Sequence, residues 1–154
     1  MHGLPHPNMQ SPDSLYIRRA AEIADKSGGI TAPHPNFGCV ITTTRAPDAS
    51  VVVGEGFLHA QGTKCAELQA VEAAGVLARG STAYLNMEPG DCYGDHTPVS
   101  SHVRAGISRV VGIRHPLRHL RGKAIFSLRK QGIQVDVLGE DLQTQAFEVE
   151  GCPV

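Results

Sequence analysis

The chain has 154 residues, of which 41% are hydrophobic, 19% charged and 5% aromatic, and its formal net charge is -1. This composition predicts a globular domain with its own core, and it gives no electrostatic or stacking basis for binding nucleic acid or an anionic membrane. No apolar run approaches the roughly 20 residues of a membrane-spanning helix. Four cysteines in a chain of this size favour reduced thiols inside a cell over a disulfide scaffold.

The sequence predicts three regions along the chain. Residues 1–12 carry three prolines and two histidines without helical or strand periodicity, so we expect them to be disordered. They contain no arginine and no apolar stretch, so they are neither a signal peptide nor a transit peptide, although a transit peptide removed upstream is compatible with the sequence. A single domain follows over residues 13–142, and residues 143–154 form a C-terminal tail in which the pattern fades.

Helical spacing of apolar residues alternates with short apolar runs along this domain. The expected elements are a helix over 13–27, strands at 37–43 and 51–57, a helix at 65–78, a strand at 83–87, a helix at 97–105, a strand at 109–113, a helix at 121–131 and a strand at 133–138. The first helix takes its apolar positions from Leu15, Ala20, Ile23 and Ala24. This order predicts an α/β fold in which crossover helices join parallel strands in the second half.

Four motifs carry a resemblance to a known family. Residues 31–40 fit T-x-P-N-P-x-V-G-C-V, residues 54–56 fit G-x-G, residues 62–67 fit G-x-x-H-A-E, and residues 88–99 fit E-P-C-x-x-Y-G-x-x-P-P-C, each with departures. Over residues 14–142 the chain resembles the deaminase domain of riboflavin biosynthesis, which has the cytidine-deaminase-like fold. The resemblance implies a three-layer α/β/α structure with a mixed five-stranded sheet.

The departures from the motifs fall at the family's metal ligands. The histidine ligand is Cys65 here, the two cysteine ligands are Gly90 and Val99, a further histidine falls on Leu58, and the loop asparagine falls on His34. In this the chain is similar to the plant pyrimidine reductases, whose N-terminal deaminase-like domain has lost its zinc ligands. That similarity implies a plastid location, and otherwise we expect a soluble intracellular protein.

The loss of metal-ligand side chains determines whether we expect this chain to catalyse deamination. Zinc makes a nucleophile by lowering the pKa of its bound water from 15.7 to about 7, and a catalytic zinc needs three protein ligands. Gly90 and Val99 offer no donor atom. We therefore expect no metal cofactor and no deaminase activity, with Glu67 as the vestige of the family's proton shuttle. Alternatively, Glu67 persists because a carboxylate in the first helical turn is stabilised by about 0.3–1 kcal/mol.

A second interpretation keeps the enzyme active. Cys65, Cys92 and His96 form a relocated zinc site in an active diaminohydroxyphosphoribosylaminopyrimidine deaminase, with His34 or His59 as a fourth group. Thiolate and imidazole are suitable zinc ligands, but the paired C-x-x-C of a structural site is absent.

The resemblance also implies a ligand and partners. A phosphoribosylaminopyrimidine would contact His34, Asn36, Gly38 and Glu88, and a 5-amino-6-(5-phosphoribosylamino)uracil reductase, as a further domain or a separate protein, would act with this domain in a homodimer. A basic cluster is either a solvated rim or a phosphate site; it comprises Arg114, Arg118, Arg121 and Lys123. We expect Cys39 to be a buried hydrophobe and His102 to lie on the surface.

Overall fold

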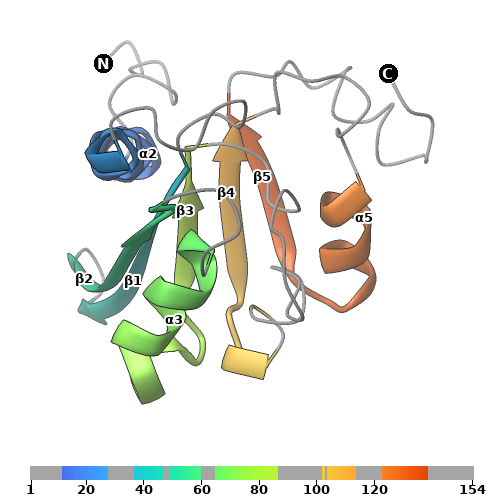
Figure 1. Ribbon diagram of the computed structural model, residues 1–154. Helices are drawn as coiled ribbons and strands as arrows, with labels where there is room; N and C mark the ends of the chain where they lie inside the picture. The colour runs from blue at the N-terminus through green and yellow to red at the C-terminus, as the bar shows by residue number, and fades with distance from the viewer. Residues whose placement is uncertain are drawn as a thin grey trace, which may run out of the picture.

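The computed structural model describes residues 12–27, 37–46, 49–59, 65–86, 102, 104–113 and 123–138. Nearly all of the segment expected to be disordered and the whole C-terminal tail lie outside these residues. The strands form one sheet of order β2-β1-β3-β4-β5 (Figure 1). They are β1 (Gly38–Ala46), β2 (Ala49–Phe57), β3 (Thr82–Leu85), β4 (Arg109–Ile113) and β5 (Gln134–Leu138). β1 runs antiparallel to β2 and β3, whereas β3, β4 and β5 are parallel, which confirms the expected mixed sheet.

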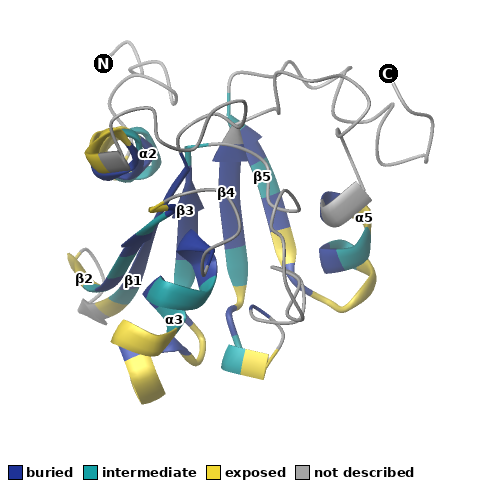
Figure 2. Ribbon diagram, in the orientation of Figure 1, coloured by how far each residue is buried: buried dark blue, intermediate teal, exposed yellow. Residues whose placement is uncertain are grey.

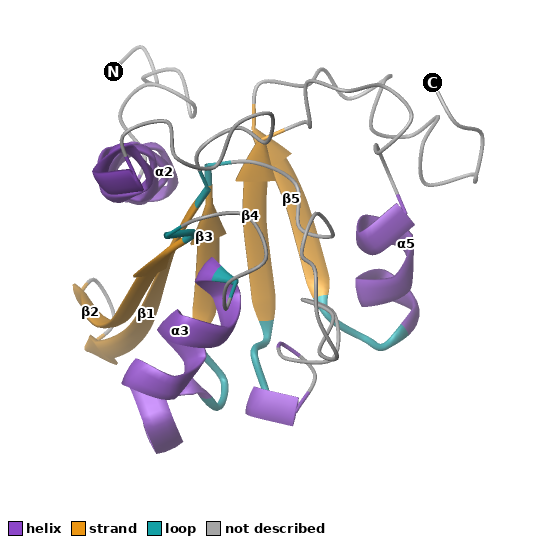
Figure 3. Cartoon of the chain, viewed as in Figure 1, coloured by secondary structure: helices purple, strands orange, loops and turns teal. Residues whose placement is uncertain are grey.

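Helices cover both faces of this sheet (Figure 3). They are α2 (Pro12–Ala24), which continues as the 3-10 turn η1 (Asp25–Ser27), α3 (Ala66–Ala74), which continues as η2 (Gly75–Ala78), and α5 (Lys123–Lys130). Of the helix expected over 97–105, the described residues 102, 104 and 105 are helical. Within the described part of the chain, none of the helices has the length and hydrophobicity needed to span a bilayer.

Alternate residues of each strand face opposite layers. Helices cover both faces, so the central strands β3 and β4 are buried along most of their length, whereas burial alternates with exposure along the edge strand β5 (Figure 2). On one face, Ile17 of α2 packs with Tyr84 and Val111, and on the other face α3 and α5 cover Val110. Leu15, expected among the apolar positions of the first helix, is 56% exposed. It lies five residues before the buried Ala20, about 140° around the helix, so it points away from the sheet.

Two glycines in β2 let α3 approach the sheet closely. A Cβ at Gly54 would collide with the carbonyl oxygen of Ala70, and one at Gly56 would collide with that of Ala66. Alanines four residues apart on α3 complete this contact of small residues. The contact sets the first turn of α3 against the end of β2, where the candidate site is formed.

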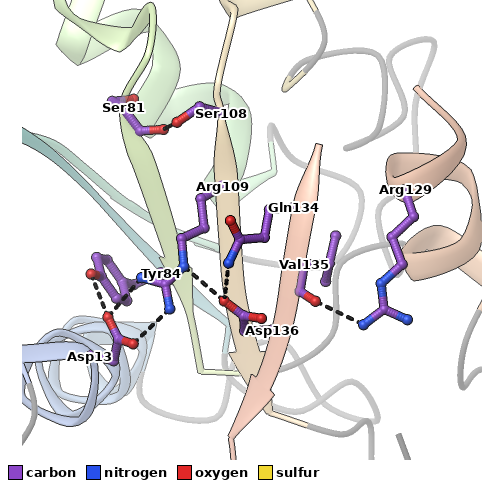
Figure 4. Close-up of polar contacts among 9 residues, drawn as sticks. All are labelled: Asp13, Ser81, Tyr84, Ser108, Arg109, Arg129, Gln134, Val135 and Asp136. Atoms are coloured by element: carbon purple, nitrogen blue, oxygen red, sulfur yellow. Dashed lines mark hydrogen bonds and ion pairs between the residues drawn. The ribbon is translucent and has the colours of Figure 1, made fainter. Parts of the chain in front are cut away.

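A polar network joins α2 to the sheet (Figure 4). Arg109 Nη1 and Nη2 donate to the Asp13 carboxylate at 3.0 and 2.7 Å, and Arg109 Nε donates to Asp136 Oδ2 at 2.8 Å. The Tyr84 hydroxyl donates to Asp13 Oδ1 at 2.8 Å. The hydrogen bonds from Arg109 hold the pKa of Asp13 below its usual value despite partial burial. One guanidinium therefore ties the first helix to two neighbouring strands.

Replacing Arg109 with methionine is expected to lower the free energy of unfolding by about 1–3 kcal/mol, because two partly buried carboxylates lose their donor. Urea denaturation at pH 7 measures this loss. Arg18→Met is the matched control: Arg18 is exposed on the same helix as Asp13, so the change should stay within about 0.5 kcal/mol. Equal midpoints for the two variants would show that the network does not hold α2.

Candidate functional site

Four chain segments meet at one end of the sheet: the start of β1, the end of β2, the start of α3 and the end of β3. The Leu58 amide donates to the carbonyl oxygen of Phe37 at 2.9 Å, which joins the end of β2 to the start of β1. The Gly38 amide donates to Asn86 Oδ1 at 2.8 Å, which joins β1 to the end of β3. These two hydrogen bonds join the strand ends that form the rim of the candidate site.

The first turn of α3 places Glu67 at this rim. Cys65 is the N-cap, with an extended backbone and no side-chain capping hydrogen bond, and it is 4% exposed. Glu67 is 1% exposed, which is exceptional for a carboxylate. Gln69 Nε2 donates to the carbonyl oxygen of Phe57 at 2.7 Å and so fixes this turn against β2. The expectation that Glu67 lies in the first helical turn is confirmed.

Cys39 of β1 lies near both of these α3 residues. It is fully buried, as expected. Burial raises the pKa of its thiol well above the usual value, and the nearby Glu67 and Cys65 raise that pKa further. A charge must be close to act on a buried thiol in this way, so Cys65 and Glu67 each lie near Cys39. Cys39 therefore remains a neutral thiol at physiological pH.

The side chains packed around Cys39 include apolar ones. Leu58, at the position of a family histidine, is 8% exposed and belongs to the same buried cluster as Phe37, Cys39 and Ala66. Its side chain has no donor atom for a metal ion and no hydrogen-bonding group for a polar ligand.

Most of the other candidate residues lie outside the described residues: His34, Asn36, Glu88, Gly90, Cys92, His96 and Val99. Neither the expected ligand contacts nor the relocated zinc site is therefore tested. In residues 12–27, 37–46, 49–59, 65–86, 102, 104–113 and 123–138, no three His, Cys, Asp or Glu side chains are placed to hold a metal ion. His59 is exposed and stacks on Phe57, with 4.3 Å between ring centroids. Of the basic cluster, only Lys123 is described, at the start of α5.

Three residues were misjudged or missed at the sequence level. His102 was expected on the surface but is fully buried, so that prediction is wrong. Its burial could have been predicted from the sequence. Val99, His102 and Val103 follow one another at helical spacing, which places His102 on the apolar face of the expected helix. Asn86 and Gln69 were not singled out. An asparagine directly after a strand is a typical residue for binding backbone groups, whereas a glutamine on a helix gives no comparable signal.

Comparison with known proteins assigns the family. The diaminohydroxyphosphoribosylamino-pyrimidine deaminase of Buchnera aphidicola (subsp. Schizaphis graminum) is 35% identical over 127 residues, which are 81% of this chain and 83% of that protein. The chain belongs to this deaminase family. The expectation from the motifs is thus confirmed, although no family model matches the chain.

Within this family, higher identity is found with a plant protein. The chloroplastic riboflavin biosynthesis protein PYRR of Zea mays is 64% identical over 140 residues, which are 88% of this chain and 22% of that protein. The chain thus spans less than a quarter of this relative's length. The solved diaminohydroxyphosphoribosylaminopyrimidine deaminase/5-amino-6-(5-phosphoribosylamino)uracil reductase of Thermotoga maritima superposes with a TM-score of 0.71 at 27% identity, covering 89% of this chain and 38% of that one. This agreement confirms the α/β cytidine-deaminase-like fold.

Proposed function

We propose that this chain is a riboflavin-pathway deaminase-like domain that has lost the deamination chemistry and retains a site for a phosphoribosylaminopyrimidine. The observation that carries the proposal is Glu67, which is buried at the rim of the site beside Cys65 and Cys39 while a leucine occupies the neighbouring family position. A buried carboxylate is costly to keep without a function. Its retention next to an apolar wall supports ligand binding without hydrolysis.

The residues present do not fit the family's zinc ion. Of the three ligand positions, only Cys65 carries a donor, because Gly90 has no side chain and Val99 has only methyl groups. Leu58, at the position of a further family histidine, adds none. We therefore assign no metal cofactor to this domain.

A second candidate function is an active zinc-dependent deaminase with a relocated metal site. It is favoured by one observation: Cys65 lies in the same turn as Glu67, so a metal held by Cys65, Cys92 and His96 would be near a carboxylate able to move protons. Under this alternative Glu67→Ala abolishes turnover. Under the main proposal there is no turnover to lose.

The domain is proposed to act with a 5-amino-6-(5-phosphoribosylamino)uracil reductase. Support comes from the length of the maize PYRR protein outside the matched region and from the Thermotoga maritima protein, which is named for both activities. The reductase is either a further domain of the same polypeptide or a separate protein, and we propose that the assembly is a homodimer. Because the maize relative is named chloroplastic, we propose a plastid location.

Titration with the diamino-phosphoribosylaminopyrimidine substrate of the family tests the ligand site. A raised melting temperature is expected, because a ligand at 100 times its Kd stabilises the folded state by about 2.7 kcal/mol. Glu67→Gln, which keeps the side-chain volume, should weaken binding. Glu72→Gln on the exposed side of α3 is the matched control and should not. Absence of any thermal shift at millimolar ligand would refute the proposed site.

A further inference from the structure

The strand β2 forms an edge of the sheet that is apolar and exposed. It pairs with β1 on one side, and no strand pairs with its other side in the part of the chain that the structure describes (Figure 1). The first four residues of β2 are exposed, and among them Val51 and Val52 are each 40% exposed. Because an edge strand of β-branched residues presents unpaired backbone groups, it is a template for a further strand.

The exposed apolar surface continues from β2 onto η2. This 3-10 turn lies against β1 and β2, and its residues Val76 and Leu77 are 91% and 45% exposed. Val51 lies opposite Thr43, two residues beyond the buried Ile41, so its side chain points to the face of the sheet that carries α3 and η2. Exposed apolar side chains of a strand and of a helical turn therefore lie on the same face at the same edge.

The charge pattern at this edge fits a second copy of the same chain. Residues 49–54 and 75–78 include no charged side chain, so pairing of two copies about a two-fold axis brings no like charges together there. The opposite edge of the sheet, β5, is different. Its central residue is Asp136, and antiparallel pairing of two β5 strands about that residue would set two carboxylates opposite each other, which is destabilising.

We propose that the outer edge of β2 pairs antiparallel with β2 of a second copy, so that the two sheets join across the interface of a homodimer. The inference rests on the homodimer proposed above and assigns its interface. The register of β2 with β1 is irregular on either side of residues 50–52. A two-fold axis at Val51 keeps the new pairing within this regular stretch, because Val51 then lies opposite its counterpart and Ser50 lies opposite Val52. The two exposed residues of η2 border the strand pair, where their burial adds to the stabilisation.

Sedimentation equilibrium and amide hydrogen exchange of the full chain test this interface. The unaltered chain should dimerise, and exchange at the amides of residues 50–52 should slow as the protein concentration rises through the Kd of the dimer. Val51→Lys sets two ammonium groups opposite each other at the axis and should raise this Kd by about tenfold or more. Phe126→Lys is the matched control, because Phe126 is also apolar and 55% exposed but lies on α5, at the other end of the sheet (Figure 1). It should leave the Kd unchanged.

The outcomes separate the interface from the rest of the proposed function. A chain that stays monomeric at about millimolar concentration would refute the homodimer, and the interface with it. A dimer that Val51→Lys leaves intact, that Phe126→Lys weakens equally, or that forms without slower exchange at residues 50–52 would refute the β2 interface alone. Ligand titration and zinc content are measured independently of the oligomeric state, so the proposed ligand site and the loss of deamination chemistry stand or fall separately.

Discussion

Restoring the three donor positions together, through Cys65→His, Gly90→Cys and Val99→Cys, is expected to yield a protein that binds about one zinc ion per chain. The reason is that the surrounding frame is preserved. Position 65 lies at the start of α3 beside a buried Glu67, and the chain keeps the family's motifs on both sides of residues 90 and 99. Elemental analysis after exhaustive dialysis measures the stoichiometry.

The control for this prediction is Cys65→His alone. It restores one donor of three, and a single imidazole does not hold zinc against dialysis. Adding Glu67→Gln to the triple variant should leave zinc binding intact, because this residue is a proton carrier in the family and not a ligand. A folded triple variant without zinc would show that positions 90 and 99 no longer converge on position 65.

Acidification from pH 6.5 to pH 4 is expected to reduce the free energy of unfolding by about 3 kcal/mol through His102 alone. Its imidazole is fully buried, and neither ring nitrogen has a hydrogen-bond partner in the described part of the chain. Burial lowers the pKa of His102 to about 4, from 6.5. The unfolded chain therefore takes up a proton over this range while the folded chain does not, so stability is complete above pH 6.5 and is lost as the pH falls towards 4.

Urea denaturation across this pH range measures the effect. His102→Leu has a similar volume and no titrating group, so it should abolish the dependence and cost less than about 1.5 kcal/mol at pH 7. His59→Gln, at an exposed histidine, should retain the full dependence. Asp13 affects stability in a different pH range. Its pKa is lowered in the folded protein, so the stability that it contributes is lost only when the pH falls below 3.8, the usual pKa of an aspartate. A wild-type stability that stays constant between pH 6.5 and 4 would contradict the buried neutral state of His102.

The order and type of the elements could be predicted because the residue patterns are local. The strand at 109–113 was predicted with its observed bounds, because the run is short and rich in β-branched residues, which favours a strand over a helix. Gly106 and Gly132 marked helix ends and both have positive φ. The helix expected over 65–78 ends instead at Ala74 and continues as a 3-10 turn, because Gly75 also adopts positive φ within an apparently continuous pattern.

The candidate site was harder to predict, because its contacts join residues far apart in sequence. Glu67 and Cys39 were named individually, but their proximity depends on how β1 packs against α3. The bond between Asn86 and Gly38 spans 48 residues and has no periodic signature. The burial of His102 was likewise missed, because the residue was expected to be exposed on account of its polar side chain, although its position lies on the apolar face of the expected helix.

Zinc content is the most direct test of the central claim that this domain has kept the deaminase frame and lost its chemistry. We would measure zinc per chain by elemental analysis, together with turnover of the diamino-phosphoribosylaminopyrimidine, on folded protein purified without added metal or a histidine tag. The proposal predicts zinc far below stoichiometric and no ammonia release. Near-stoichiometric zinc that is lost in Cys92→Ser, with turnover that is lost in Glu67→Ala, would contradict it and establish the relocated site.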